Sequence, residues 1–178
     1  MKKKSLALSE VYRLLEPGPV VLVSTSDRGK SNIMTMSWHT MMEFEPPIIG
    51  CVISQGDFTF NALKKTKECV INIPAANLAK QVVGCGNTTG RNIDKFKKFK
   101  LTATPASQVK SPLIDECFAN LECKVIDMKM VNKYNFFVME VIKAWIASPK
   151  FNHKTLHHKG KGIFMVAGKT IKLPSKMK

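Results

Sequence analysis

Long apolar stretches are absent from this 178-residue chain. No run approaches the roughly 18 apolar residues that a membrane-spanning helix requires, so we expect no membrane partner. The basic start at Met1–Lys4 is followed by Ser9, Glu10 and Arg13 instead of the apolar segment of a signal peptide. These absences predict a cytoplasmic protein. With 44% hydrophobic residues the chain can bury a core, and we expect a single domain over residues 1–178.

Metal-binding and redox signatures are equally scarce. The cysteines form neither a CxxC pair nor a cluster with histidines, and most lie within apolar runs: Cys51, Cys69, Cys85, Cys117 and Cys123. We therefore expect reduced cysteines that pack in the core, as in a cytoplasmic protein. His157 and His158 are neighbours, and a strand would point them to opposite faces. We expect no bound metal.

Acidic residues are few, and none follows Glu140. The chain has 28 Lys and Arg against 13 Asp and Glu, a formal net charge of +15. Such a charge suits nucleic acid, an anionic membrane or a phosphorylated ligand, although a solvated basic surface is the simpler explanation. Neither a helix-turn-helix pattern nor a basic-aromatic RNA-binding strand is present. We expect no nucleic-acid partner, and a basic, non-enzymatic nucleic-acid-binding β-barrel is the alternative function.

Repeats, low-complexity tracts and regular alternation of strands with helices are also missing. Apolar runs predict strands at residues 20–25, 32–40, 48–54, 68–74, 118–128 and 134–146. Helices are predicted at residues 9–15, from Asp57 onward, at 75–83 and at 92–100. The strand over 118–128 alternates apolar residues with Glu122 and Lys124, which predicts a half-exposed face. Many strands with few helices predict a mainly β, largely antiparallel barrel with peripheral helices.

The most informative stretch runs from Asn32 to Thr40. It follows a buried strand and a turn at Asp27–Gly29, so it should form the second arm of a hairpin. Hydroxyls stand at Thr35 and Ser37 beside Trp38, where a strand buried only for packing would carry aliphatic residues. Hydroxyls beside an indole suit a flat polar ligand. A polar strand edge with a half-buried tryptophan is the other interpretation.

A second candidate site follows the strand over residues 48–54. Asp57 is the expected N-cap of a helix, and the Ser54 and Thr59 hydroxyls lie beside the amino end of that helix. Free N–H groups at a helix amino terminus bind phosphate readily, while an ordinary capped helix would have the same sequence. The glycine-containing loop 85–92 could also approach a ligand, although a plain loop is the simpler interpretation.

Several motifs together resemble one known family. Asn32-Ile33-Met34-Thr35-Met36-Ser37-Trp38 is similar to the N-x-M-T-x-S-W pattern of the flavin reductase-like, FMN-binding split-barrel proteins, which include the flavoredoxins. Further matches are Val70-Ile71-Asn72-Ile73-Pro74, Asp94-Lys95-Phe96 and the strand pair around Cys123 and Glu140. Their order and spacing carry the resemblance, which covers residues from about 17 to about 173.

The resemblance implies an FMN-binding split β-barrel and a set of cofactor contacts. Thr35, Met36 and Ser37 would offer backbone and hydroxyl contacts to the isoalloxazine and ribityl groups, with Asn32 and Trp38 supporting that wall. The FMN phosphate would bind Ser54 and Thr59. Lys95 would lie close to the flavin, where a cation favours the negative charge that reduction adds to the ring. Without the resemblance, Lys95 would be an ordinary solvent-facing lysine.

The resemblance also implies an aromatic residue near the flavin, and Phe164 is the best positional match. Related proteins commonly carry G-D-H at the turn where this chain has Lys133 and Tyr134, and Tyr134 could donate a hydrogen bond there. Where the family often has an arginine, this chain has Asp57.

A homodimer with its flavin near the subunit interface is a further implication of the resemblance. The implied activity is reduction linked to NADH or NADPH as a transient donor, or electron transfer through bound FMN as in flavoredoxins. A small-molecule or protein electron acceptor is implied. No dedicated nicotinamide-binding fingerprint is visible, so both activities stay open.

Overall fold

A single antiparallel sheet organises the molecule. The computed structural model describes residues 3–11, 18–147 and 153–174. In this part of the chain eight strands pair in the order β3-β2-β6-β9-β10-β5-β4, with β1 added alongside β10. The strands are β1 Lys4–Leu6, β2 Val21–Asp27, β3 Lys30–Met36, β4 His39–Glu43, β5 Ile48–Val52, β6 Glu68–Ile73, β9 Ala119–Asp127 and β10 Phe136–Ile146.

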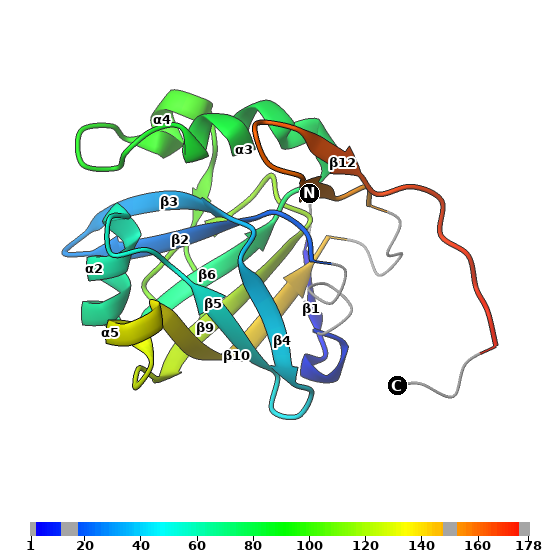
Figure 1. Ribbon diagram of the computed structural model, residues 1–178, viewed down its shortest axis with the longest axis horizontal. Coiled ribbons are helices and arrows are strands. Elements are labelled where there is room, and N and C mark those ends of the chain that lie inside the picture. Colours follow the sequence, from blue (N-terminus) through cyan, green and yellow to red (C-terminus); the bar gives the residue numbers. More distant parts are fainter. Residues whose placement is uncertain (1–2, 12–17, 148–152, 175–178) are drawn as a thin grey trace.

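Two short ribbons and a few helices surround this sheet. β7 Ala103–Thr104 pairs with β8 Leu113–Ile114, and β11 Leu156–His158 pairs with β12 Phe164–Val166. The α-helices are α2 Phe58–Thr66, α3 Ala79–Gly86, α4 Lys95–Phe99 and α5 Val131–Tyr134, and 3-10 turns cover Leu8–Glu10 and Ala76–Leu78. Figure 1 shows α3 and α4 together on one side of the curved sheet. The predicted mainly β, largely antiparallel barrel with peripheral helices is confirmed. No helix in the described ranges is long and apolar enough to span a membrane.

The second strand is buried on both faces, as its continuous apolar run predicts. Val21 and Val23 pack in the main core inside the barrel. Val20 and Leu22 point the other way and pack with Val82 of α3 and other residues beneath α3 and α4. Because side chains alternate along a strand, one apolar run can pack against the barrel core on one face and against the helical layer on the other. This alternation fixes α3 and α4 over the outer face.

The predicted hairpin forms, but its second arm, β3, ends at Met36. Thr40, at the end of the stretch predicted as one strand, belongs to β4. β2 and β3 pair from Val21 with Met36 to Asp27 with Lys30, joined by Arg28 and Gly29. Both turn residues have positive φ, 50° and 78°, the backbone that matches the twist of a two-residue hairpin. In the sheet order β3 stands at the edge, so one side of its backbone faces the cleft described below.

Several helix boundaries differ from their predictions. The helix expected over 75–83 becomes a 3-10 turn followed by α3, which continues to Gly86. Gly84 does not end the helix. It lies against the Phe99 ring, where a Cβ would collide, so close packing accounts for a glycine at this position. The helix expected over 92–100 is α4 alone, which begins after Asp94, whose carboxylate accepts a hydrogen bond from the Lys97 N–H at 3.1 Å.

Three more expectations differ from what the structure shows. Asp57 does occupy the N-cap position of α2, but its carboxylate makes no capping hydrogen bond. The turn expected at 131–134 is the single helical turn α5. Of the helix expected over 9–15, the structure shows a 3-10 turn at Leu8–Glu10, and residues 12–15 lie outside the described part of the chain.

The predicted half-exposed face of β9 is wrong at Glu122, which is fully buried. Its carboxylate accepts hydrogen bonds from the Trp145 indole N–H at 2.7 Å and from the backbone N–H groups of Gln108 at 2.6 Å and Ser107 at 3.1 Å. Burial alone would raise the pKa of this carboxyl, and these donors instead lower the pKa below its ordinary value. The carboxylate holds the loop before β8 against the sheet.

Replacing Glu122 by glutamine should lower the free energy of unfolding by about 2–4 kcal/mol, because the amide NH₂ would face donors. Chemical denaturation measures the difference. Since the folded state lowers the pKa of Glu122, its contribution is complete above the unfolded pKa of about 4.3 and is lost as the pH falls through the folded value. The stability gap should therefore shrink from pH 5 toward pH 3. The same substitution at half-buried Glu140 is the control, with little expected change.

Candidate functional site

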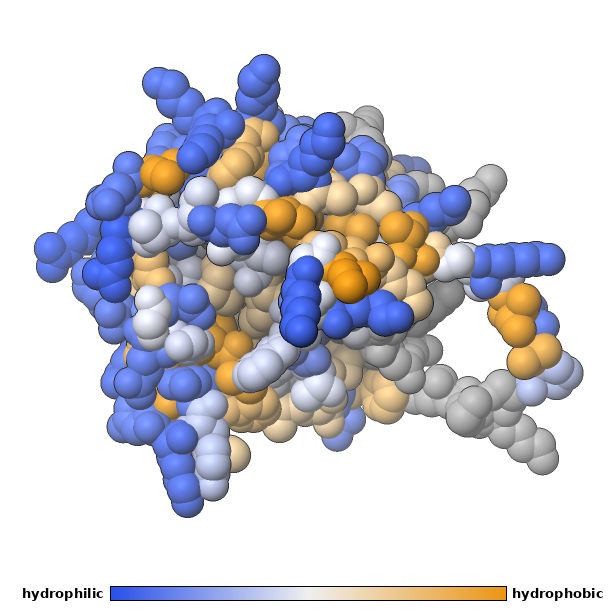
Figure 2. Space-filling model, turned by 45° about the horizontal axis from the view of Figure 1, so that its top comes forward, coloured by the Kyte–Doolittle hydropathy of each residue, from blue (hydrophilic) through white to orange (hydrophobic). Residues whose placement is uncertain are grey.

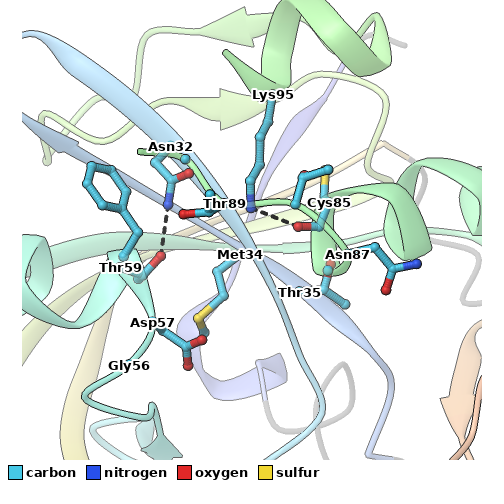
Figure 3. A pocket seen from close by; sticks show the side chains of 14 residues that line it. Asn32, Met34, Thr35, Gly56, Asp57, Thr59, Cys85, Asn87, Thr89 and Lys95 are labelled. Carbon is cyan, nitrogen blue, oxygen red and sulfur yellow. Dashed lines mark hydrogen bonds between the residues drawn. The ribbon is translucent and has the colours of Figure 1, made fainter. Parts of the chain in front are cut away.

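A cavity of about 310 Å³ opens beside the edge strand β3. Its walls come from four places in the chain: β3, the start of α2, the end of α3 with the following loop, and α4. Figure 3 shows side chains from these segments converging, with Lys95 reaching down from α4. Among the residues that line this first cavity are Asn32, Thr35, Asp57, Thr59, Gly90 and Lys95.

Lys95 is a buried cation in this first cavity, only 4% exposed. Its ammonium donates to the carbonyls of Ile33 and Cys85, each at 2.7 Å. An ammonium has three N–H donors, so one is left for a ligand. Burial lowers the pKa of Lys95, and the nearby Cys85 and Asp57 partly oppose this. The solvent-facing lysine considered from the sequence is excluded.

Asn32 and Thr59 form the opposite wall. The Asn32 amide donates to the Thr59 hydroxyl at 2.9 Å, and both residues are buried. The Asn32 Oδ1 atom is buried without a hydrogen-bond partner in the described residues. That oxygen lies against Gly90, so Asn32 braces the wall of the first cavity and its Oδ1 atom is closed to a ligand.

The start of α2 provides donors and one unfavourable charge. The first N–H groups of a helix have no partner within the helix, and those of Phe58 and Thr59 begin α2 at the first cavity. Half-buried Asp57 lines the same cavity. The Asp57 carboxylate and the Lys95 ammonium therefore place one negative and one positive charge at this end of the site. A phosphate would be attracted by the lysine and the helix terminus and repelled by Asp57.

A second cavity of about 340 Å³ adjoins the first and shares Thr35, Gly86 and Asn87 with it. Apolar side chains line much of it, including Val20 just before β2, Val82 of α3 and Phe164 of β12. Ser37 adds a hydroxyl, and the His158 ring lies 5.1 Å from the Phe164 ring, centroid to centroid. The two cavities make one cleft along β3, charged and polar at one end and largely apolar at the other.

The structure brings six of the ten predicted site residues to this cleft. Asn32, Thr35, Thr59 and Lys95 line the first cavity, and Ser37 and Phe164 line the second with Thr35. Ser54 is exposed next to the first cavity, and its hydroxyl accepts a hydrogen bond from the Gly56 N–H at 3.2 Å. The remaining three, Met36, Trp38 and Tyr134, are not among the residues that line the cleft.

Those three residues lie elsewhere for identifiable reasons. The Met36 side chain is buried in the main core, because it points inward from β3 where Thr35 points outward. Trp38 is 71% exposed, past the end of β3, and Tyr134 is 52% exposed on α5, with the Lys133 ammonium 5.1 Å from its ring. Their side chains do not form the cleft of a single chain.

Sequence reasoning missed part of the wall. The loop from Asn87 to Gly90, for which a plain loop was the simpler interpretation, lines the first cavity. Gly90 is buried, and a Cβ on it would collide with the Asn32 amide. The two glycines flanking this polar run were the available signal. His158, considered from the sequence only as a metal ligand, lines the second cavity. No cluster of His, Cys, Asp or Glu in the described ranges could hold a metal ion.

The fold is an open antiparallel barrel with a two-part cleft along an edge strand, an arrangement typical of β proteins that bind small molecules. The chain belongs to the flavin reductase like domain family, because the sequence model of that family matches residues 13–163. An uncharacterized protein of Archaeoglobus fulgidus is 31% identical over 159 residues, 84% of this chain and 89% of that protein. One of Pyrococcus abyssi is 34% identical over 133 residues, 75% and 76% of the two chains.

Solved structures agree on the fold. An FMN-binding domain of a flavin reductase-like enzyme from Shewanella baltica superposes with a TM-score of 0.91 at 25% identity, covering 97% of this chain and 98% of that one. A flavoredoxin of Desulfovibrio vulgaris superposes with a TM-score of 0.80 at 20% identity, covering 89% and 91%. The resemblance seen in the motifs is therefore confirmed.

Proposed function

We propose that this protein binds FMN in the cleft along β3, with the phosphate in the first cavity and the ring system in the second. The observation that carries the proposal is the cleft itself, which joins the buried Lys95 ammonium and the amino end of α2 to an apolar end bordered by Phe164. A phosphorylated, hydroxylated chain attached to a flat ring matches this order of chemistry. The Shewanella baltica domain named for FMN binding supports the choice.

The residues of the cleft would divide the work of holding the cofactor. Lys95 and the first N–H groups of α2 would balance the phosphate. The backbone edge of β3 at Thr35 and the Ser37 hydroxyl just after β3 would face the ring, with Phe164 against it. When bound, FMN supplies hydride or single-electron transfer.

The proposed activity is flavin-linked oxidoreduction in the cytoplasm. The protein would either reduce its acceptor with NADH or NADPH as donor, or act as a flavoredoxin-like electron carrier. The acceptor would be a small molecule or another protein. All five cysteines are free and buried, which suits a reducing compartment. Steady-state oxidation of NADH and NADPH by the FMN-loaded protein separates the two activities, because a carrier would oxidise neither.

Spectroscopy of the purified protein tests the proposal. A yellow protein, or an apoprotein that quenches FMN fluorescence at a one-to-one ratio, is the expected result. A colourless protein that leaves FMN fluorescence unchanged would overturn it. If such a protein instead bound oligonucleotides with strong salt dependence, the alternative of a nucleic-acid-binding barrel would replace the flavin proposal.

Asp57 gives a prediction specific to the phosphate. Asp57→Asn should tighten FMN binding by about three- to tenfold, because it removes a carboxylate from the phosphate end and disturbs no capping hydrogen bond. Isothermal titration with FMN and with riboflavin measures the effect. Riboflavin has no phosphate, so its affinity should stay within twofold. An equal gain for both ligands would place the phosphate away from Asp57.

A homodimer with the flavin near its interface is part of the proposal. Apolar side chains are exposed around the second cavity, with Trp38 next to Ser37 and Met165 next to Phe164. Figure 2 shows apolar side chains gathered on this side of the molecule. The segment 167–174 leaves the barrel with Ile171 and Leu173 exposed (Figure 1). Apolar surface of this kind is typical of a subunit interface.

Trp38→Glu should convert the dimer to a monomer and weaken FMN binding, because a buried carboxylate at an apolar interface is costly. Sedimentation velocity and FMN titration measure the two effects. Ile126→Glu on β9, at a side chain 50% exposed, is the matched control and should leave both unchanged. A monomeric variant that binds FMN normally would separate the flavin site from the interface.

A further inference from the structure

The ribbon of β11 and β12 forms one wall of the second cavity. His158 of β11 pairs with Phe164 of β12, and both line the cavity together with Gly162 of the connecting turn. The rest of the lining comes from residues around β2, β3 and α3, including the Ser37 hydroxyl. Figure 1 shows the ribbon lying beside α3. A ligand in this cavity would therefore contact the ribbon on one side and the barrel with α3 on the other.

The ribbon is tied to the barrel at its base. The side chain of Leu156 is buried beneath α3, and its carbonyl accepts a hydrogen bond from the Val20 N–H at 2.7 Å. The Lys154 carbonyl accepts another from the Ala76 N–H at 2.8 Å. His158 follows only two residues after Leu156, so these contacts hold the His158 ring at the cavity instead of leaving it on a free loop.

The two neighbouring histidines of β11 have different surroundings. Nε2 of His157 lies 2.9 Å from the Thr155 hydroxyl, and His157 does not line the second cavity. The His158 ring contacts the Phe164 ring, and its nitrogens have no hydrogen-bond partner in the described part of the chain. Because side chains alternate along a strand, only one of two adjacent histidines can face the cavity. That histidine is the one with nitrogens free for a ligand.

The chemistry of the second cavity is apolar, with polar groups on two walls. Among the described residues of its lining, His158 is the only one whose side chain type exchanges protons near neutral pH. Ser37 and Thr35 add hydroxyls from the barrel side, and no carboxylate lines this cavity in the described ranges. Apolar walls with a few polar groups suit a flat apolar ring that carries oxygen atoms at its edge.

We propose that the second cavity admits a quinone as electron acceptor and that His158 is its proton donor, an inference that rests on the proposed FMN function. One quinone oxygen takes a hydride from reduced FMN, its C=O double bond becomes a single bond, and the ring becomes aromatic. The other oxygen is left with a negative charge and takes a proton from the His158 imidazolium. The products are the hydroquinone, oxidised FMN and neutral His158, which is exposed and regains its proton from water.

Reoxidation of the reduced protein tests this inference. FMN-loaded protein reduced with dithionite is mixed without oxygen with duroquinone, a benzoquinone whose ring carbons are all methylated and cannot add a thiol. His158→Gln keeps a hydrogen-bond donor but cannot supply a proton, so reoxidation should slow at least tenfold, within the usual contribution of a general acid. Ferricyanide takes electrons without a proton, and its rate should stay within twofold.

His157→Gln is the matched control, because His157 is the adjacent residue of the same strand and does not line the cavity. Its rates with duroquinone and ferricyanide should both stay within twofold of the native values. A second readout does not depend on turnover. In ¹H–¹⁵N spectra of the oxidised, FMN-loaded protein, duroquinone should shift the ring signals of His158, identified by their loss in His158→Gln, and leave those of His157 in place.

The outcomes separate this inference from the function on which it rests. Equal duroquinone rates in native protein and His158→Gln would exclude His158 as the donor. So would an equal slowing with ferricyanide, or His158 ring signals that do not move when duroquinone is added. Each of these results overturns the quinone inference and leaves FMN binding intact. Absence of bound FMN in the native protein overturns the proposed function itself.

Discussion

Replacing Lys95 by methionine should weaken FMN binding by about 30–100-fold. The substitution removes the buried cation of the first cavity and the N–H that two backbone carbonyls leave free for a ligand. A charge-assisted hydrogen bond to phosphate in a partly buried site is worth this much, since each tenfold change in affinity is 1.4 kcal/mol. Fluorescence titration with FMN measures the loss.

Lys97→Met is the matched control, because Lys97 is an exposed lysine of the same helix. Its FMN affinity should match that of the native protein within twofold. A second readout uses pH. Burial lowers the pKa of Lys95 from its ordinary value of 10.5, so native affinity should begin to fall at a lower pH than a free lysine would give. The methionine variant should lack that decline, and a decline of the same size in both proteins would exclude Lys95 as its source.

The hydroxyl-rich strand shows what the sequence could predict. The turn at Asp27–Gly29 and the alternation after it predicted the hairpin, and the hydroxyls at Thr35 and Ser37 line the cleft. The same alternation could have assigned Met36 to the core, because a strand that points Thr35 outward must point Met36 inward. The resemblance to the family pattern implied a contact through the Met36 backbone. A backbone contact does not depend on which way the side chain points.

Lys95 shows where local pattern gives too little information. A run of lysines at the start of a short helix is normally solvated, and its sequence does not distinguish Lys95 from Lys97. Burial of Lys95 depends on the carbonyls of Ile33 and Cys85, which come from two other elements. Glu122 is buried for the same kind of reason, because its donors at Ser107, Gln108 and Trp145 become neighbours only in the folded sheet.

Gly90→Ala should weaken FMN binding by at least tenfold, for a purely steric reason. A Cβ at Gly90 would collide with the Asn32 amide and lie 3.0 Å from the Phe58 ring. Asn32 cannot swing away freely, because it is buried and bonded to Thr59. The loop must therefore shift, or the Asn32–Thr59 hydrogen bond must break, and either change deforms the first cavity. Overpacking of this kind costs about 1–3 kcal/mol, and titration with FMN should show it.

Gly56 provides the matched control for Gly90. It lines the same cavity, but a Cβ there would meet only the Ser54 hydroxyl at 3.7 Å, an ordinary contact. Gly56→Ala should therefore leave FMN affinity within threefold. The double variant Asn32→Ala/Gly90→Ala tests the cause, because removing the Asn32 amide relieves the main collision. Its affinity should equal that of Asn32→Ala alone, whereas a further tenfold loss would show that Gly90 acts through something other than Asn32.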